Sequence, residues 1–187
     1  MIKIGQRITD CELDAYLGGS FAKIKLSQYL GKWLVMFFYP GDFTFVCPTE
    51  LGELADNYEA IKALNAEVVS VSTDSKHVHL AWHSESPTIK KITFPMLSDP
   101  TGELCREMGT YIEAEGVSLR GTFIIDPDGI LRTCEIHDNS IGRSCSELLR
   151  KLQAAIFVRE HNGEVCPASW KPGQTALKPS VDLVGKI

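Results

Sequence analysis

A cysteine followed directly by a proline is the feature of this 187-residue sequence that points most clearly to chemistry. Cys47 and Pro48 lie in the segment Pro40-Gly-Asp-Phe-Thr-Phe-Val-Cys-Pro-Thr-Glu50, between an apolar run and an amphipathic stretch. Proline is tolerated in the first turn of a helix but not in its interior, so a helix must begin only a few residues before Pro48. Free backbone N–H groups and the helix dipole at such a start favour a thiolate at Cys47.

The side chains near Cys47 fit nucleophilic chemistry. Thr44 lies three residues earlier, so its hydroxyl and the Cys47 sulfur share one side of the turn. A thiolate beside a hydroxyl and free amides suits attack on a polar, electron-accepting atom. An arbitrary cysteine is more often a small buried hydrophobic residue. The position after a strand, together with Pro48 and Thr44, favours a functional role here.

Strands and helices alternate around this segment. The predicted strands are Trp33–Tyr39, Glu67–Thr73, Gly121–Asp126 and Ile130–Ile136, the last two joined by the turn Asp126-Pro-Asp-Gly129. The predicted helices are an amphipathic one over Leu51–Leu64, one capped by Asp74 or Ser75 and ending near His83, and one from the capping box Ser144–Glu147 through Ile156. Loop and short helix are expected over Glu85–Met108. This order predicts an α/β fold, a thioredoxin-like three-layer sandwich with a central mixed β-sheet.

The composition changes after the last predicted helix. Asn162-Gly163 stops that helix, and the residues that follow are rich in proline and glycine. We therefore expect a domain over residues 1–160 and an extended C-terminal arm over residues 161–187. Cys166 lies in this arm, where a mobile thiol can reach a sulfenic acid and form a disulfide. An idle exposed thiol fits its position equally well.

Composition and charge narrow the classes of function. Hydrophobic residues make up 44% of the chain and charged residues 23%, as in ordinary globular proteins. The net charge of −5 lacks the basic excess of a nucleic-acid binder. No apolar run approaches the roughly 18 residues that a membrane span needs. The first residues show no apolar stretch after a basic one, so we expect no secretory signal and a cytoplasmic protein.

The remaining cysteines and the histidines give no site. The six cysteines include no Cys-x-x-Cys pair. Cys105, Cys134 and Cys145 are expected to be buried structural thiols, although Cys145 also lies at a predicted helix start, and the exposure of Cys11 is left open. The three histidines at 77, 79 and 83 do not share one helix face, and Cys134-x-x-His137 is a loose pair, so no metal site is expected. No nucleotide-binding motif occurs, and we expect no bound cofactor.

The segment around Cys47 resembles a known family. Pro40-x-x-x-Thr44-x-x-Cys47 is the signature of peroxiredoxins, and the string from Phe43 to Glu50 is similar to that of their typical two-cysteine branch. Further motifs match along the chain: Ser70-Val-Ser-Thr-Asp74, Ala81-Trp-His-Ser84, Ser98-Asp-Pro-Thr-Gly102, Arg120-Gly-Thr-Phe-Ile-Ile-Asp126 and Gly163-Glu-Val-Cys-Pro-Ala-x-Trp170. The ending Leu183-Val-Gly-Lys-Ile187 is similar to the bacterial alkyl hydroperoxide reductase C group.

The resemblance implies roles for particular residues. Cys47 would be the peroxidatic cysteine, which attacks a peroxide and becomes a sulfenic acid. Cys166 would be the resolving cysteine, contributed by the partner subunit of at least a dimer. Thr44 would hydrogen-bond the peroxide, and Pro40 would shield the sulfur from water. Two further residues complete the set: Arg120 would stabilise the thiolate and polarise the peroxide, and Glu50 would orient the arginine side of the pocket.

The resemblance also implies partners. Substrates would be hydrogen peroxide and alkyl hydroperoxides, and electrons would come from a flavoprotein disulfide reductase of the AhpF type using NADH, or from thioredoxin. Homodimers would assemble into a decamer, and the first turn around Cys47 would unwind during turnover. A holdase chaperone or a disulfide-relay redox sensor on the same scaffold are the alternatives. The chain lacks the Gly-Gly-Leu-Gly loop and the Tyr-Phe ending of peroxidases that overoxidise easily, so we expect disulfide formation to outpace a second oxidation.

Overall fold

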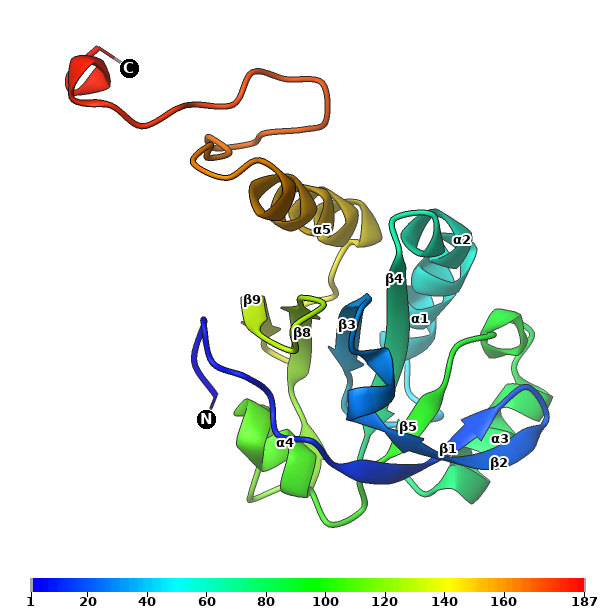
Figure 1. Ribbon diagram of the computed structural model, residues 1–187. Coiled ribbons are helices and arrows are strands. Elements are labelled where there is room, and N and C mark those ends of the chain that lie inside the picture. Colours follow the sequence, from blue (N-terminus) through cyan, green and yellow to red (C-terminus); the bar gives the residue numbers. More distant parts are fainter. Residues whose placement is uncertain (1, 187) are drawn as a thin grey trace. The chain divides into compact units, whose positions relative to one another are not determined.

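A mixed β-sheet forms the centre of the fold, and helices pack around it (Figure 1). The structure is a computed structural model that describes residues 2–186, and within them seven strands form one sheet in the order β2-β1-β5-β4-β3-β8-β9. The strands of this sheet are β1 (Glu12–Leu17), β2 (Ser20–Lys25), β3 (Trp33–Phe38), β4 (Ala66–Ser72), β5 (Met96–Ser98), β8 (Arg120–Ile125) and β9 (Leu131–His137). A separate small sheet pairs β6 (Tyr111–Ile112) with β7 (Val117–Ser118).

The helices are spread along the same chain. The α-helices are α1 (Cys47–Asp56), α2 (Tyr58–Lys62), α3 (Lys76–Glu85), α4 (Glu103–Met108) and α5 (Cys145–Glu160). The 3-10 helices are η1 (Leu26–Tyr29), η2 (Ile89–Lys91) and η3 (Val181–Leu183). None of the helices within residues 2–186 is both long and apolar enough to cross a membrane.

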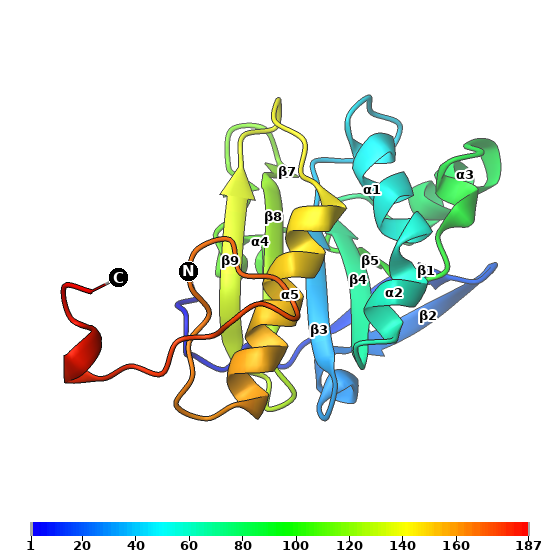
Figure 2. The same ribbon diagram turned by 90° about the horizontal axis from the view of Figure 1, so that it is seen from above.

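The sheet is mixed in direction, as the sequence predicts. β3, β4 and β5 run parallel, whereas β8 and β9 at one end and β1 and β2 at the other are antiparallel to their neighbours. Figures 1 and 2 show α1 and α2 over one face of the sheet and α4 over the opposite face. The predicted α/β fold with helices on both faces of a central mixed sheet is therefore confirmed.

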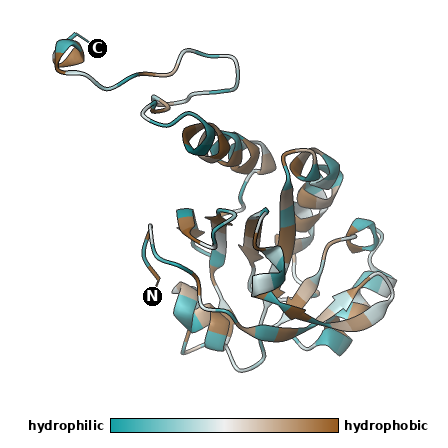
Figure 3. Ribbon diagram, in the orientation of Figure 1, coloured by the Kyte–Doolittle hydropathy of each residue, from teal (hydrophilic) through white to brown (hydrophobic). Residues whose placement is uncertain are grey.

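Strand β3 is buried along its whole length and lies in the middle of the sheet. Leu34, Met36 and Phe38 alternate onto the side of the core that also holds Leu104 and Met108 of α4. The intervening side chains point to the opposite face, where α1 lies. Figure 3 shows the central strands as mainly hydrophobic, which fits a sheet covered on both faces.

Three strands of the seven-stranded sheet were not predicted, nor were β6 and β7 of the small sheet. β1 and β2 form a hairpin across Gly18-Gly19, and both glycines have positive φ, as a tight hairpin turn requires. β5 is only three residues long and follows Pro95, so its apolar residues give no periodicity to detect. It nevertheless pairs with both β1 and β4, which makes it the link between the hairpin and the parallel strands.

The single helix expected over Leu51–Leu64 is two helices. Asn57 separates α1 from α2, and its side-chain amide donates to the Glu53 carbonyl oxygen at 2.8 Å. The same carbonyl oxygen also accepts from the Asn57 backbone N–H at 3.2 Å, so Asn57 binds the last turn of α1 through both its side chain and its backbone. The predicted cap of the next helix is confirmed, because the Ser75 hydroxyl oxygen accepts a hydrogen bond from the Val78 backbone N–H at the start of α3.

The chain divides into two compact units, the first ending at Cys145 and the second beginning at Ser146. The second unit contains nearly all of α5 together with the tail. In the tail Val165 and Leu177 exchange backbone hydrogen bonds of 2.8 and 2.9 Å, and the Trp170 ring lies 4.7 Å from that of Phe157. The expected arm thus has local structure of its own, and the boundary expected at residue 160 stays a prediction.

Candidate active site

Cys47 is the first residue of α1 and is fully buried. Pro48 follows in the first turn, so the helix begins where the sequence predicted. The backbone N–H groups of Thr49 and Glu50 donate to the Val46 carbonyl oxygen at 3.0 and 3.3 Å, which closes the turn around the cysteine. The sulfur therefore lies at the positive end of the helix, at the edge where the parallel strands end.

Arg120 reaches Cys47 from the start of β8. Its Nη1 lies 3.4 Å from the Cys47 sulfur and donates to Glu50 Oε2 at 2.7 Å. The other side of the guanidinium donates twice to the Asn139 carbonyl oxygen, from Nε at 3.0 Å and Nη2 at 2.7 Å. The side chain is 3% exposed. A guanidinium fixed in this way keeps its positive charge beside the sulfur and favours negative charge there.

Glu50 lies one turn after Cys47 and is also buried. Its carboxylate receives Arg120 on one side and Arg143 on the other. From Arg143, the backbone N–H and Nε donate to Oε1 at 2.7 and 2.9 Å, and Nη2 donates to Oε2 at 3.1 Å. Burial alone would raise the pKa of Glu50, but the hydrogen bonds and charge of Arg143, with the charge of Arg120, outweigh burial and hold that pKa below its ordinary value.

Arg143 is a member of the site that the sequence did not predict. Its guanidinium lies 3.4 Å from the centre of the Phe37 ring, and its Nη1 donates to the Gly121 carbonyl oxygen at 2.8 Å and to Thr122 Oγ1 at 3.1 Å. Phe37 and Thr122 are paired across β3 and β8, so both point to the face that carries α1. A single arginine in a loop gives no sequence pattern that would predict its role. Residues 50, 120 and 143 are far apart in the sequence and come together only in the folded chain.

The charges in this cluster cancel only in part. Two guanidinium groups face one ionised carboxylate, which leaves one net positive charge beside the Cys47 sulfur. A Cys47 thiolate would balance that charge. Buried ionic groups are stable when they are paired and hydrogen-bonded in this way. The arrangement can therefore hold an anionic sulfur and stabilise negative charge that develops beside it.

The other predicted residues of the first unit lie on the loop before α1. Pro40 is half-buried just after β3. Thr44 is exposed, and its hydroxyl donates to the Gly41 carbonyl oxygen at 2.9 Å. Because this bond uses the hydroxyl proton, the Thr44 oxygen still has a lone pair to accept from a ligand. The structure thus joins Cys47, Glu50 and Arg120 by direct contacts, and places Pro40 and Thr44 next to them in the chain.

Cys166 lies in the second unit and is half-buried. Its Sγ lies 3.8 Å from the Ala154 carbonyl oxygen of α5. Burial raises the pKa of its thiol, against a smaller lowering by the charge of Arg150. The Val165–Leu177 bridge adjoins this cysteine and restrains the segment that carries it.

The remaining cysteines are poor nucleophiles or lie apart from the cluster. Burial, with nearby acidic groups, raises the pKa of Cys11 to about 11 and of Cys105 and Cys145 to about 12. For Cys145 this outweighs its place at a helix start. Cys134 is exposed on β9, so the expectation that it is a buried structural thiol is wrong; on β9 its neighbours in sequence, Thr133 and Glu135, are half-buried instead.

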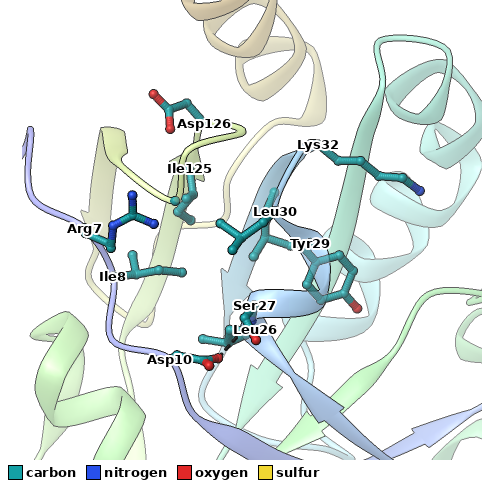
Figure 4. A pocket seen from close by; sticks show the side chains of 12 residues that line it. Arg7, Ile8, Asp10, Leu26, Ser27, Tyr29, Leu30, Lys32, Ile125 and Asp126 are labelled. Atoms are coloured by element: carbon teal, nitrogen blue, oxygen red, sulfur yellow. Dashed lines mark hydrogen bonds between the residues drawn. The ribbon is translucent and has the colours of Figure 1, made fainter.

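A cavity of about 60 Å³ lies at the opposite end of β3 from Cys47 (Figure 4). Arg7, Tyr29, Leu30 and Lys32 are among the residues that line it. None of the residues of the Cys47 cluster lines this cavity, so it is not the place where a substrate would meet the sulfur. In residues 2–186 no group of three or more His, Cys, Asp or Glu side chains lies close enough to hold a metal ion.

Comparison with known proteins connects these features. Residues 4–134 match the model of the AhpC/TSA family, and residues 156–186 match the C-terminal domain of 1-Cys peroxiredoxin. Alkyl hydroperoxide reductase C of Salmonella typhimurium is 50% identical over 187 residues, which cover all of both chains. The crystal structure of Enterococcus faecalis AhpC is similar with a TM-score of 0.87 and 49% identity, covering 89% of this chain and 100% of that one. Reduced Plasmodium vivax 2-Cys peroxiredoxin gives a TM-score of 0.90 at 34% identity, covering 96% and 94%.

Proposed function

This chain belongs to the AhpC/TSA family and is a peroxiredoxin, and from that premise we propose that it reduces hydrogen peroxide and organic hydroperoxides at Cys47. The observation that carries the proposal is the contact of Arg120 with both the Cys47 sulfur and Glu50. It supports a sulfur held as an anion with a fixed donor beside it. Burial raises the pKa of the thiols of Cys105 and Cys145 to about 12, which makes these two cysteines poor nucleophiles.

In the proposed first step the Cys47 thiolate attacks the terminal oxygen of the peroxide. The S–O bond forms as the O–O bond breaks, sulfur loses two electrons, and a sulfenic acid remains. The leaving alkoxide or hydroxide takes a proton and departs as an alcohol or water. Arg120 would stabilise the negative charge that grows on this oxygen, and the free lone pair of Thr44 would accept from the peroxide O–H.

In the second step the Cys166 thiolate would attack the Cys47 sulfenic acid. An S–S bond forms and the sulfenic oxygen leaves as water after taking a proton. We propose that Cys166 comes from the partner subunit, as in the family that the chain resembles. Because Cys47 is fully buried in a closed first turn, no second thiol can reach its sulfur until that turn opens locally. Pro40 would shield the sulfur until then.

The cycle needs two electrons from a separate protein to reduce the disulfide. We propose a flavoprotein disulfide reductase that uses NADH, with thioredoxin as the alternative donor, because the relatives are named alkyl hydroperoxide reductase C. The proposed intersubunit disulfide requires at least a homodimer, and we propose that such dimers assemble to a decamer, as the family resemblance implies. Phe43 and Phe45 support subunit contacts, since the loop before Cys47 exposes 55% and 93% of these apolar residues. A cytoplasmic location and a part in cell redox homeostasis stay predictions.

Peroxide consumption with dithiothreitol as reductant tests the proposed activity. Wild type should consume hydrogen peroxide and cumene hydroperoxide, and Cys47→Ser should lose the activity entirely. Cys134→Ser is the matched control, because it removes an exposed thiol outside the cluster, and its activity should equal that of wild type. Equal consumption by Cys47→Ser and wild type would refute the assignment, and it would leave a chaperone or a disulfide relay as the function to pursue.

A further inference from the structure

A second buried polar cluster lies under the loop that precedes Cys47. His79 of α3 is fully buried, and its Nδ1 lies 2.7 Å from Asp42 Oδ2. Its Nε2 lies 3.2 Å from the carbonyl oxygen of Leu97 in β5. Asp42 is 8% exposed and lies five residues before Cys47. This pair takes no part in the chemistry described above.

The two contacts of His79 fix where protons must be. A carbonyl oxygen only accepts, so Nε2 carries a hydrogen and donates to Leu97. Either Nδ1 is also protonated and donates to an Asp42 carboxylate, or a protonated Asp42 donates to Nδ1. In both cases one proton joins the two side chains and the pair is neutral overall. Such a pair is stable in a buried site only while both partners are present.

Asp42 connects this pair to the loop. The Tyr39 hydroxyl donates to Asp42 Oδ1 at 2.7 Å, and the Asp42 backbone N–H donates to Asp74 Oδ2 at 2.8 Å. The same Asp74 oxygen accepts from the Ser72 hydroxyl at 2.8 Å. The loop is therefore tied to the ends of β3 and β4 and, through His79, to α3 and β5. Between Asp42 and Cys47 lies Thr44, whose hydroxyl bonds the loop backbone.

We propose that His79 is a positioning residue for peroxide reduction. With Asp42 it holds the loop Pro40–Val46 in one conformation, so that Thr44 and the first turn of α1 keep their places around the Cys47 sulfur. This inference rests on the proposed function of Cys47. His79 touches no reacting atom and acts only through Asp42.

The test measures the second-order rate constant for oxidation of reduced protein by hydrogen peroxide, followed by tryptophan fluorescence. His79→Phe leaves Asp42 without its partner and should lower this constant by about 10- to 100-fold, the scale expected for a misplaced reacting group. His79→Gln, which can reach only one of the two contacts, should give an intermediate loss. Asp42→Ala should lose as much as His79→Phe.

Two variants separate positioning from a general loss of stability. Asp42→Asn can donate to Nδ1 of a neutral His79 and still accept from Tyr39, so it should keep a rate constant within about 3-fold of wild type. His83→Gln is the matched control. His83 is one turn further along α3 and bonds Tyr16 and the Ile92 carbonyl oxygen, away from the loop. Its loss should lower the melting temperature but not the rate constant.

Hydrogen exchange gives a readout that does not depend on activity. The backbone amide of residue 42 should exchange faster in His79→Phe and Asp42→Ala than in wild type. In His83→Gln its exchange rate should equal that of wild type. The inference is overturned if His79→Phe and Asp42→Ala are folded and have the rate constants and the Asp42 exchange of wild type. It is also overturned if Asp42→Asn is as slow as Asp42→Ala. If wild type fails to react with hydrogen peroxide, as Cys47→Ser is expected to, the proposed function is overturned instead.

Discussion

Around Cys47, single side chains set the charge of the site. Arg120 and Arg143 share the carboxylate of Glu50, and the positive charge left over lies 3.4 Å from the sulfur through Arg120. Each donor in this cluster is also bound elsewhere, Arg120 by Asn139 and Arg143 by the backbone of Gly121. The groups therefore do not need to reorganise when negative charge moves from sulfur to the leaving oxygen, which is the condition for strong electrostatic stabilisation.

Replacement of Arg120 should separate the role of its charge from that of its shape. Arg120→Met removes both and should lower the rate constant for peroxide reduction by about 100-fold or more, as expected for the loss of one such donor. Arg120→Lys keeps the charge, but its single ammonium group cannot bond the sulfur, Glu50 and Asn139 together. Its rate constant should therefore lie between those of wild type and Arg120→Met. Stopped-flow fluorescence of the reduced proteins measures these constants. A wild-type rate constant in Arg120→Met would show that the contact with Cys47 is not used.

The pKa of Glu50 predicts how stability depends on pH. This pKa lies below its ordinary value near 4.5 in the folded chain, so ionised Glu50 stabilises the fold above that value. The stabilisation is lost as pH falls through the lowered folded pKa. Glu50→Gln should therefore be less stable than wild type at pH 7, and the difference should shrink below about pH 4.5. Urea midpoints across this range test it, with the exposed Glu115→Gln as control. A difference that does not change with pH would contradict the ion-pair account.

The sequence was most informative where one residue constrains its neighbours. Pro48 predicted that a helix starts within a few residues before it, with Cys47 in the first turn, because proline has few allowed positions in a helix. Arg120 came only from the family resemblance, since an arginine before a strand is ordinarily a surface charge. Arg143 and the Asp42–His79 pair were not found at all. Their partners are 93 and 37 residues away, and no local pattern records such a contact.

Two element starts meet at the site: Cys47 is the first residue of α1 and contacts Arg120, which begins β8. Arg120 is the first residue of β8, and Gly121 after it offers its carbonyl oxygen to Arg143. A Cβ on Gly121 would lie 2.6 Å from Thr110 Cγ2 and 2.8 Å from Phe123 Cε2. Glycine is needed at this position because neighbouring side chains fill the space. Sequence patterns missed three strands of the large sheet. These strands build the end of the sheet that lies away from β8: β1, β2 and β5.

Gly121→Ala should therefore damage both the fold and the site. Overpacking here should cost about 1–3 kcal/mol of unfolding free energy and move the start of β8, which would lower the rate constant for peroxide reduction. Thr110→Ser removes one of the two blocking atoms while keeping a hydroxyl for the bond to Ser118. The double variant should recover part of the loss in denaturant midpoint and in rate. Full stability in Gly121→Ala would show that β8 is not as tightly packed as the structure has it.

At the scale of the whole molecule, the two proposed redox cysteines belong to different units of the chain. The first unit buries Cys47 within its charge cluster, and the second carries Cys166 in a tail that the Val165–Leu177 bridge restrains. In the proposed cycle, disulfide formation would therefore link local opening at Cys47 to the arrival of Cys166. Sequence composition marked the tail from residue 161 but gave no sign that α5 groups with it, because a boundary inside a helix leaves no change in residue type.

A prediction about the order of oxidation events rests on the sequence of one loop. Residues 84–91 do not carry the Gly-Gly-Leu-Gly sequence of easily overoxidised peroxidases, so we expect modest excess peroxide to produce disulfide rather than Cys47 sulfinic acid. Intact-mass analysis of the wild type after such treatment should show loss of two hydrogens per disulfide and little gain of two oxygens. Cys166→Ser, which cannot form the disulfide, should accumulate the sulfinic form instead. Early sulfinic acid in wild type would contradict the expected fast resolution.

We propose that Cys47 receives the oxygen and that Cys166 of another subunit removes it. Non-reducing electrophoresis with mass mapping, after one equivalent of hydrogen peroxide, tests both halves in one measurement. Wild type should run as a dimer joined by a Cys47–Cys166 peptide pair, Cys166→Ser should stay monomeric with a single oxygen on Cys47, and Cys47→Ser should remain unchanged. An unchanged dimer band in Cys166→Ser, or oxygen on any cysteine other than Cys47, would contradict the account.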